Sequence, residues 1–252
     1  MPYVDIGEGV QLHYEETNPE GEVTLLFCHG SGGNSRHWRY QEQMPGNIRM
    51  LAVDLPGHGE SSGSPQKTVV DYREALKSMV DALQLKNFFL SGHSLGGAIT
   101  LDYARCYPED LEGMVLVATG ARLRVMPSIL ETFRQEQVFP DMPYFIYGDN
   151  ADPKLLEESQ REMEETPPSV FYADFTACDN FDIIEETSSI NVPALIIVGS
   201  EDRLTPPKYS QFLADNLPRA ELLYIEGAGH MVMLEAYQQV NEKIVSWIEG
   251  LK

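Results

Sequence analysis

Cysteine is scarce in this chain of 252 residues, which contains only Cys28, Cys106 and Cys178. An odd number of widely separated cysteines does not fit a disulfide framework, and no Cys/His set has the spacing of a zinc site. A chain of this length buries enough apolar surface to fold without disulfides or a structural metal. The sequence therefore predicts one or two domains held together by a packed core.

Basic residues and long apolar runs are also lacking. The 18 lysines and arginines are outnumbered by 39 aspartates and glutamates, which gives a formal net charge of −21. Such a surface repels phosphate backbones and anionic lipids, so we expect neither a nucleic-acid partner nor a membrane partner. No stretch approaches the roughly 18 apolar residues that cross a bilayer, and no signal-peptide pattern opens the chain. We expect a cytoplasmic protein that is a monomer or a homodimer.

Short apolar runs alternate with amphipathic stretches along most of the chain. A hairpin closed by Gly7 and Gly9 is predicted over residues 3–14. Continuous apolar runs are typical of buried parallel strands and cover residues 23–28, 50–54, 87–91, 114–119, 194–198 and 221–225. Helical periodicity covers residues 68–83, 95–107, 206–217 and 234–251. This order favours a doubly wound α/β fold with a mostly parallel sheet.

The segment 122–186 breaks this alternation. It contains no clear buried strand, but many Glu, Met and aromatic residues at helical spacing. Roughly sixty residues are far too many for an ordinary connection between two sheet strands. We therefore predict a helical insertion over residues 122–186, at the carboxyl edge of a core formed by residues 1–121 and 187–252.

A candidate nucleophile lies in the sequence Gly-His-Ser-Leu-Gly at residues 92–96, between a predicted strand and a predicted helix. The G-x-S-x-G pattern alone is weak, because it occurs by chance in roughly one chain of this length in ten. A sharp strand–turn–helix, however, needs small flanking residues and pushes the serine side chain clear of the backbone. This context favours Ser94 as a nucleophile over an incidental serine in a tight turn.

A histidine has to lie near Ser94, because a serine hydroxyl is a poor nucleophile without a base. His230 lies between the last predicted strand and the last predicted helix, at the same sheet edge as Ser94, and is the predicted base. The other five histidines have different expected roles. His13 and His37 are expected to be solvated. His29 and His58 are expected to form hydrogen bonds within their turns, and His93 to point away from Ser94.

The base in turn needs a carboxylate that fixes its tautomer and stabilises the imidazolium. Asp202 follows the predicted strand over residues 194–198, and the chain order Ser, Asp, His is the one expected for a nucleophile elbow. Glu201 is the nearest competitor for this role. Asp182, at the end of the insertion, is a more distant one.

Donors for an oxyanion are predicted in the glycine-rich loop His-Gly-Ser-Gly-Gly at residues 29–33. We assign them to the backbone N–H groups of Ser31 and of Leu95, which follows the nucleophile. The loop lacks the Gly-Lys-Ser/Thr ending of a phosphate loop and the G-x-G-x-x-G of dinucleotide sites. Residues 54–61 are interpreted as a structural turn. Because the chain itself supplies every group that acyl transfer needs, we expect no cofactor and no metal.

Five motifs in this order, HGSGG, DLPGHGESS, GHSLGG, GSEDRLTPP and GAGH, resemble those of the α/β-hydrolase superfamily, in the branch with one helical cap. The resemblance covers nearly the whole chain outside the insertion. It implies an eight-stranded sheet, a catalytic triad and oxyanion donors at the positions named above, and a cap that closes the pocket.

The resemblance also implies a range of activities. A serine nucleophile disfavours haloalkane dehalogenases, which use aspartate there, and His93 disfavours C–C hydrolases, which tend to have Asn at that position. We predict a serine esterase that cleaves carboxylic esters of small or medium, largely apolar acyl substrates through an acyl-enzyme intermediate. The alternatives are a lactonase or C–C bond hydrolase acting on a ring-cleavage product and, from another class, a small-ligand receptor on a hydrolase fold.

Apolar residues of the insertion and the core are candidates for the lining of a substrate pocket: Trp38, Met126, Phe133, Tyr144, Phe145, Tyr147, Phe171 and Met231. The alternative is that most of those in the insertion pack its own small core. Arg122 and Arg124 either pair with a substrate carboxylate or form salt bridges with nearby acids.

Overall fold

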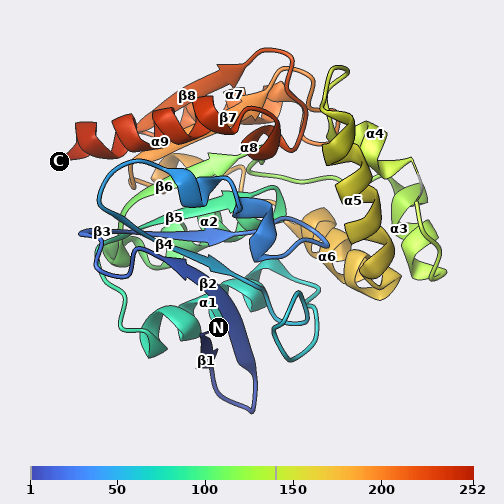
Figure 1. Cartoon of the computed structure of the whole chain (residues 1–252), viewed down its shortest axis with the longest axis horizontal. Coiled ribbons are helices and arrows are strands. Elements are labelled where there is room, and N and C mark those ends of the chain that lie inside the picture. The colour runs from blue at the N-terminus through green and yellow to red at the C-terminus, as the bar shows by residue number, and fades with distance from the viewer. Residues whose placement is uncertain (1, 140) are drawn as a thin grey trace.

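The computed structural model describes residues 2–139 and 141–252. A single eight-stranded sheet runs through the molecule with helices on both faces (Figure 1). Its strands are β1 (Tyr3–Asp5), β2 (Gln11–Thr17), β3 (Val23–Cys28), β4 (Ile48–Val53), β5 (Phe88–His93), β6 (Leu111–Val117), β7 (Ala194–Gly199) and β8 (Ala220–Ile225).

The order of the strands in the sheet is β1-β2-β4-β3-β5-β6-β7-β8. β1, β2 and β4 pair antiparallel, whereas every pair from β4 to β8 is parallel. The predicted α/β fold with an eight-stranded, mostly parallel sheet is therefore confirmed. Because parallel strands share one carboxyl edge, the loops after β3, β5, β7 and β8 emerge on the same side.

Helices fill the connections between the strands. Those of the core are α1 (Val69–Ala82), α2 (Leu95–Cys106), α7 (Pro207–Asn216), α8 (Val232–Glu235) and α9 (Tyr237–Leu251). Short 3₁₀ helices cover Ser35–Trp38, Gln41–Gln43, Pro108–Asp110 and Thr187–Ser189. The last predicted helix, over residues 234–251, is two helices, because Ala236 leaves helical geometry with φ −129° and ψ 41°. No helix within the described residues is long and apolar enough to cross a membrane.

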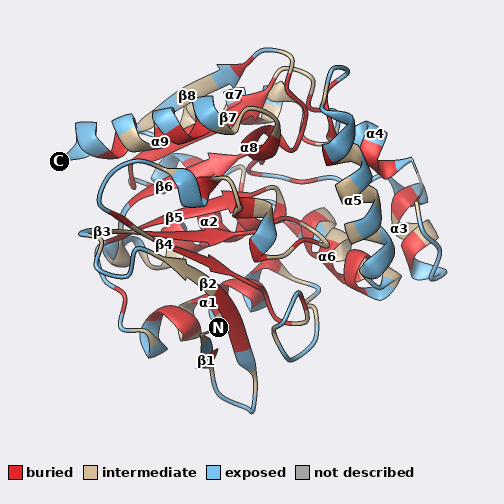
Figure 2. Ribbon diagram, in the orientation of Figure 1, coloured by how far each residue is buried: buried red, intermediate tan, exposed pale blue. Residues whose placement is uncertain are grey.

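Two apolar layers sandwich the sheet, so the central strands are buried along their length (Figure 2). Successive side chains of β3 alternate between them. Leu26 packs on the side of α1, α2 and α7, and Leu25 packs on the side of α8 and α9. This burial on both faces explains why the parallel strands appear in the sequence as continuous apolar runs.

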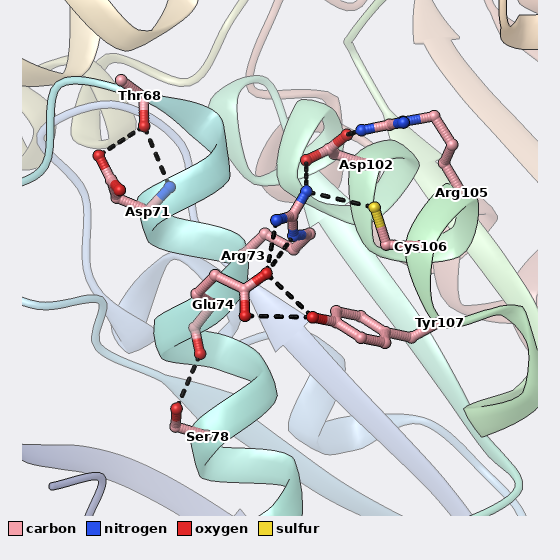
Figure 3. Close-up of polar contacts among 9 residues, drawn as sticks. All are labelled: Thr68, Asp71, Arg73, Glu74, Ser78, Asp102, Arg105, Cys106 and Tyr107. Carbon is pink, nitrogen blue, oxygen red and sulfur yellow. Dashed lines mark hydrogen bonds and ion pairs between the residues drawn. The ribbon is translucent and has the colours of Figure 1, made fainter.

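A buried ion pair fixes α2, the helix that follows Ser94, against α1 (Figure 3). Arg73 Nη1 of α1 donates to Asp102 Oδ2 of α2 at 2.6 Å, and Arg105 donates to the other oxygen of Asp102. At its start, α1 is capped by Thr68, whose Oγ1 accepts the backbone N–H of Asp71. The ion pair therefore ties α2, the helix that follows Ser94, to its neighbour α1.

The insertion between β6 and β7 contains α3 (Pro127–Arg134), α4 (Met142–Ile146), α5 (Pro153–Glu165) and α6 (Pro168–Asn180). These helices gather at one end of the sheet (Figure 1). A small apolar cluster holds α3 to α6, with Phe133 and Phe171 stacked at 5.0 Å between ring centroids. At its base, an isolated bridge joins Arg122 to Asp182.

Candidate active site

Ser94 occupies a sharp turn between β5 and α2. Its φ of 53° and ψ of −114° lie outside the regions that L-residues ordinarily adopt. Three contacts hold this backbone: Ser94 N–H donates to Val117 O at 2.9 Å, and Ser94 O accepts from Ala98 N–H and from Thr119 Oγ1. The turn leaves the Ser94 side chain half-buried at the carboxyl edge of the sheet.

His230 and Asp202 lie together at the same edge, in the loops after β8 and β7. The distance from His230 Nδ1 to Asp202 Oδ2 is 2.9 Å, and both side chains are buried. Leu204 N–H and Thr205 N–H also donate to Asp202, at 2.9 and 2.8 Å, and Thr205 Oγ1 donates at 2.7 Å. Burial raises the pKa of Asp202, but the His230 ring and these donors outweigh it and hold the pKa below its ordinary value.

Ser94 and His230 line the same cavity, although no hydrogen bond joins the two side chains. His230 Nε2 makes no hydrogen bond to any described residue, whereas Nδ1 is held by Asp202. His93 lies beside this ring, with centroids 4.6 Å apart, and its Nε2 donates to His230 O at 3.0 Å. Catalytic hydrogen bonds are often long before substrate binds, so this arrangement fits a base poised near the nucleophile.

The loop after β3 brings Ser31 to Ser94. A Cβ atom built on Gly30 would lie 3.2 Å from Ser94 Cβ, which shows how closely this loop lies against Ser94. Within the described part of the chain, neither Ser31 N–H nor Leu95 N–H donates a hydrogen bond. The N–H of Leu95 belongs to the first turn of α2, where backbone donors have no partner within the helix. Both groups are therefore free to bind an anionic oxygen.

Two cavities adjoin Ser94. The larger has a volume of about 260 Å³, and most of its lining is apolar. The smaller, of about 60 Å³, reaches Ser31, His93, His230 and Met231. Besides Ser94, residues that line the larger cavity come from the insertion, the loop after β7 and α7: Leu123, Arg124, Val125, Met126, Ile129, Phe139, Met142, Phe145, Phe175, Cys178, Arg203, Leu204, Thr205 and Tyr209.

Four of the eight predicted lining residues line a cavity beside Ser94, and four do not. Met126 and Phe145 line the larger cavity, and Phe171 and Met231 line the smaller one. The other four line neither: Trp38, Phe133, Tyr144 and Tyr147.

Trp38 is wrongly predicted as a lining residue because it packs in the core against Phe27, with ring centroids 4.6 Å apart. Phe133 belongs to the core of the insertion, as the alternative interpretation proposed, and Tyr147 is buried in the layer next to α8 and α9. Tyr144 points outward, with 69% of its surface exposed. Phe175 was missed, although it lies one helical turn beyond Phe171 and the spacing of the two aromatic residues could have revealed it.

The competing acids and two of the other histidines have partners outside the Asp202–His230 pair. Glu201 accepts the backbone N–H of Asp149 at 2.6 Å, and Asp182 pairs with Arg122 and Arg124, so neither acid binds His230. The expectation that His13 is solvated is wrong: it is buried, and its Nδ1 bonds Asp54 Oδ2 at 2.8 Å. The expectation that His37 is solvated is also wrong.

His37 is half-buried and faces Glu162 of α5 at 3.4 Å. Residues 54–61 do form a turn, in which Asp54 accepts the backbone N–H groups of Ser35 and Glu60. In residues 2–139 and 141–252, no group of three His, Cys, Asp or Glu side chains is arranged to hold a metal ion.

Comparisons with known proteins agree on the family. Residues 25–243 match the model of the alpha/beta hydrolase family. The solved structure of a thermophilic esterase is 33% identical and superposes with a TM-score of 0.85, covering 99% of this chain and 97% of the other. An enzyme of solved structure that degrades N-acyl homoserine lactones is 25% identical, with a TM-score of 0.85 and coverage of 97% and 99%. Lipase 3 of Moraxella sp. is 26% identical over 98% of this chain and 84% of its own length.

Proposed function

The chain belongs to the alpha/beta hydrolase family, and from this premise we propose that it is a serine esterase for carboxylic esters with a small or medium, largely apolar acyl group. The observation that carries the proposal is the arrangement of His230. One ring nitrogen is held by Asp202, and the other is free in a cavity shared with Ser94. This is the arrangement that a general base for a serine nucleophile needs.

The proposed reaction begins with attack of Ser94 Oγ on the ester carbonyl while His230 Nε2 takes the hydroxyl proton. The negative charge on the carbonyl oxygen is stabilised by the N–H groups of Ser31 and Leu95. His230 then gives the proton to the leaving alcohol, and an acyl-enzyme remains on Ser94. Water, deprotonated by the same ring, attacks the acyl-enzyme and releases the acid. Asp202 keeps Nδ1 protonated throughout and stabilises the imidazolium.

The insertion is proposed to act as a cap that forms most of the acyl pocket. Support comes from the larger cavity, whose lining includes Ile129, Met142 and Phe175 of three different insertion helices. A cavity of about 260 Å³ fits a short to medium acyl chain. The similarity to a thermophilic esterase and to Lipase 3 of Moraxella supports ester chemistry at this pocket.

The test is the hydrolysis of p-nitrophenyl esters of increasing chain length by the purified protein and by Ser94→Ala. We expect turnover of the shorter esters and a loss of about 10⁴-fold or more in Ser94→Ala, with an unchanged circular dichroism spectrum. The control is Ser78→Ala on the exposed face of α1, which should keep the full rate. Activity that survives in Ser94→Ala, or a wild-type protein that binds esters tightly without turnover, would contradict the proposal.

A second candidate, a lactonase, is favoured by the similarity to the enzyme that degrades N-acyl homoserine lactones. The same nucleophile and oxyanion donors open a cyclic ester by the same steps. Measuring kcat/KM for matched lactones and acyclic esters decides between the two. A ratio well above one in favour of the lactones replaces the esterase assignment.

A further inference from the structure

Asp174 lies in the middle of α6 and is completely buried, away from the proposed triad. Its carboxylate accepts three hydrogen bonds from three other parts of the chain. Oδ2 accepts from Gly32 N–H at 2.7 Å and from His58 Nε2 at 2.9 Å, and Oδ1 accepts from Tyr72 OH at 2.5 Å. We refer to these four residues as the Asp174 cluster. The cluster joins the insertion to the oxyanion loop, to the turn after β4 and to α1.

The hydrogen-bond partners define the charges in the Asp174 cluster. His58 Nδ1 faces Pro56 O at 3.1 Å, and Nε2 faces the Asp174 carboxylate, so both ring nitrogens have an acceptor as their partner. Both must therefore carry a proton, and His58 is an imidazolium paired with a carboxylate. Burial lowers the pKa of His58, but Asp174 and the Pro56 carbonyl outweigh it and raise the pKa above its ordinary value.

Gly32, the next residue after the proposed oxyanion donor Ser31, is contacted by the insertion at its N–H, at its carbonyl and beside its α-carbon. Its N–H is bound by Asp174, and its carbonyl accepts from Thr166 Oγ1 at 3.3 Å. Its φ of +66° favours glycine, and the ring of Phe171 fills the space that a Cβ atom would need. The Ser31–Gly32 peptide unit is thus held by Asp174 of α6, and the following Gly32–Gly33 unit is held by Thr166 at the end of α5.

We propose that Asp174 is a positioning residue for the oxyanion hole, acting through the backbone of Gly32. The inference rests on the proposed function. Only the two backbone dihedrals of Ser31 separate the peptide bound by Asp174 from the peptide that carries Ser31 N–H, so a shift of Gly32 turns that donor away from the developing charge. His58 and Tyr72 hold the carboxylate in place. The insertion then has two tasks: it lines the acyl pocket, and it fixes one of the two groups that stabilise the transition state.

The test compares Asp174→Asn with Asp179→Asn in esterase assays. Asn keeps the size of Asp174 but presents an NH₂ group to donors that need an acceptor. We expect Asp174→Asn to lower kcat by about 10- to 100-fold with KM within about 3-fold, because misplaced oxyanion donors affect the transition state more than the bound ester. Asp179 is the matched control, because it lies on the same helix and accepts Val125 N–H at 3.1 Å without touching the oxyanion loop.

A second readout separates positioning from general loss of structure. A boronic acid forms a tetrahedral adduct with Ser94, and one of its oxygens occupies the oxyanion hole. Its inhibition constant should rise in Asp174→Asn in proportion to the loss of kcat, and it should stay unchanged in Asp179→Asn. A variant that is merely less stable, measured below its melting temperature, keeps both kcat and boronate affinity. That result would overturn the inference.

If Asp174→Asn does not fold, the variant Tyr72→Phe tests the positioning role of Asp174 instead. This variant removes one donor to Asp174 and leaves the bonds to Gly32 and His58, and it should lower kcat and boronate affinity together by about 2- to 10-fold. Unchanged kcat in Tyr72→Phe would then overturn the inference. The proposed function fails separately, if the wild-type protein itself hydrolyses no ester.

Discussion

Besides Asp54–His13, two buried aspartate–histidine pairs lie in the described part of the chain, Asp202–His230 and Asp174–His58, and both have a nitrogen–oxygen distance of 2.9 Å. These two differ at the second ring nitrogen. In His58 it is bound to Pro56 O, whereas in His230 it makes no hydrogen bond to a described residue and lies at the cavity of Ser94. Geometry within a pair therefore does not separate the proposed catalytic histidine from a structural one. A second nitrogen without a hydrogen bond is not sufficient either, because Nε2 of His13 is buried without one. The feature that singles out His230 is an unbonded nitrogen on a ring that lines the cavity of Ser94.

The two carboxylates also differ in how far along the chain their other hydrogen-bond donors lie. Asp202 receives its additional hydrogen bonds from Leu204 and Thr205, residues of its own loop. Asp174 receives its own from Gly32 and Tyr72, which lie 142 and 102 residues away. The additional donors to Asp202 thus come from a single short segment. The second pair ties distant parts of the chain together, so its loss should affect stability as well as rate.

The largest effect that tests this comparison is expected for Asp202→Asn. An amide can present its NH₂ to His230 Nδ1 and favour the wrong tautomer, so kcat should fall by about 10³- to 10⁴-fold. The protein should remain folded. The neighbouring variant Glu201→Gln, which alters an acid outside the pair, should retain activity within about 3-fold. Equal losses in the two variants would remove the distinction between the pair and its surroundings.

A smaller effect, on stability, is expected for His58→Gln. Removing one member of a buried ion pair leaves the Asp174 charge uncompensated and should cost about 3 kcal/mol in the free energy of unfolding. Since the folded-state pKa of His58 is raised, the contribution of the pair is fully present below about pH 6.5, the unfolded value. It is lost as the pH rises through the higher folded-state value.

Urea unfolding of wild type and His58→Gln at several pH values measures this dependence. The difference in stability should be greatest in mildly acidic solution and should shrink in alkaline solution. The Asp202–His230 pair should behave in the opposite sense, because the pKa of Asp202 is lowered and its contribution is lost only in acid. A constant difference for His58→Gln across the range would show that His58 is not charged in the folded protein.

The smallest effect is expected for Thr205→Val, which removes the hydroxyl that donates to Asp202 Oδ2 at 2.7 Å but keeps the backbone donors. One hydrogen bond to a charged group out of several should matter modestly, so kcat should fall by about 3- to 10-fold, or roughly 1 kcal/mol. Steady-state kinetics with a short ester provide the measurement. A loss as large as that of Asp202→Asn would mean that Thr205, and not the histidine–aspartate contact, holds the carboxylate.

The sequence predicted those features that are encoded by short segments. Ser94, Asp202 and His230 each follow directly after an apolar strand, and in a parallel sheet this position alone brings them to one edge. The strands were found for the same reason, since burial on both faces leaves a continuous apolar run. These signals require no knowledge of which distant residues come into contact.

Contacts between distant segments were not predictable. His13 was expected in solvent, but β2 pairs with β4 and brings it to Asp54, 41 residues away. Trp38 is a large aromatic residue of the kind that often lines pockets. The 3₁₀ helix Ser35–Trp38, however, places its side chain against Phe27 of β3. The partners of Asp174 lie in three other segments, and no spacing in the sequence connects them.

The backbone at Ser94 has a further consequence. Its left-handed φ of 53° with ψ −114° costs a residue with a side chain on the order of 1–3 kcal/mol, a cost that glycine would largely avoid. The position of the proposed nucleophile is thus one at which the residue preferred for folding and the residue that the proposed chemistry needs are different. Glycine at position 94 is expected to give a more stable chain without the proposed activity.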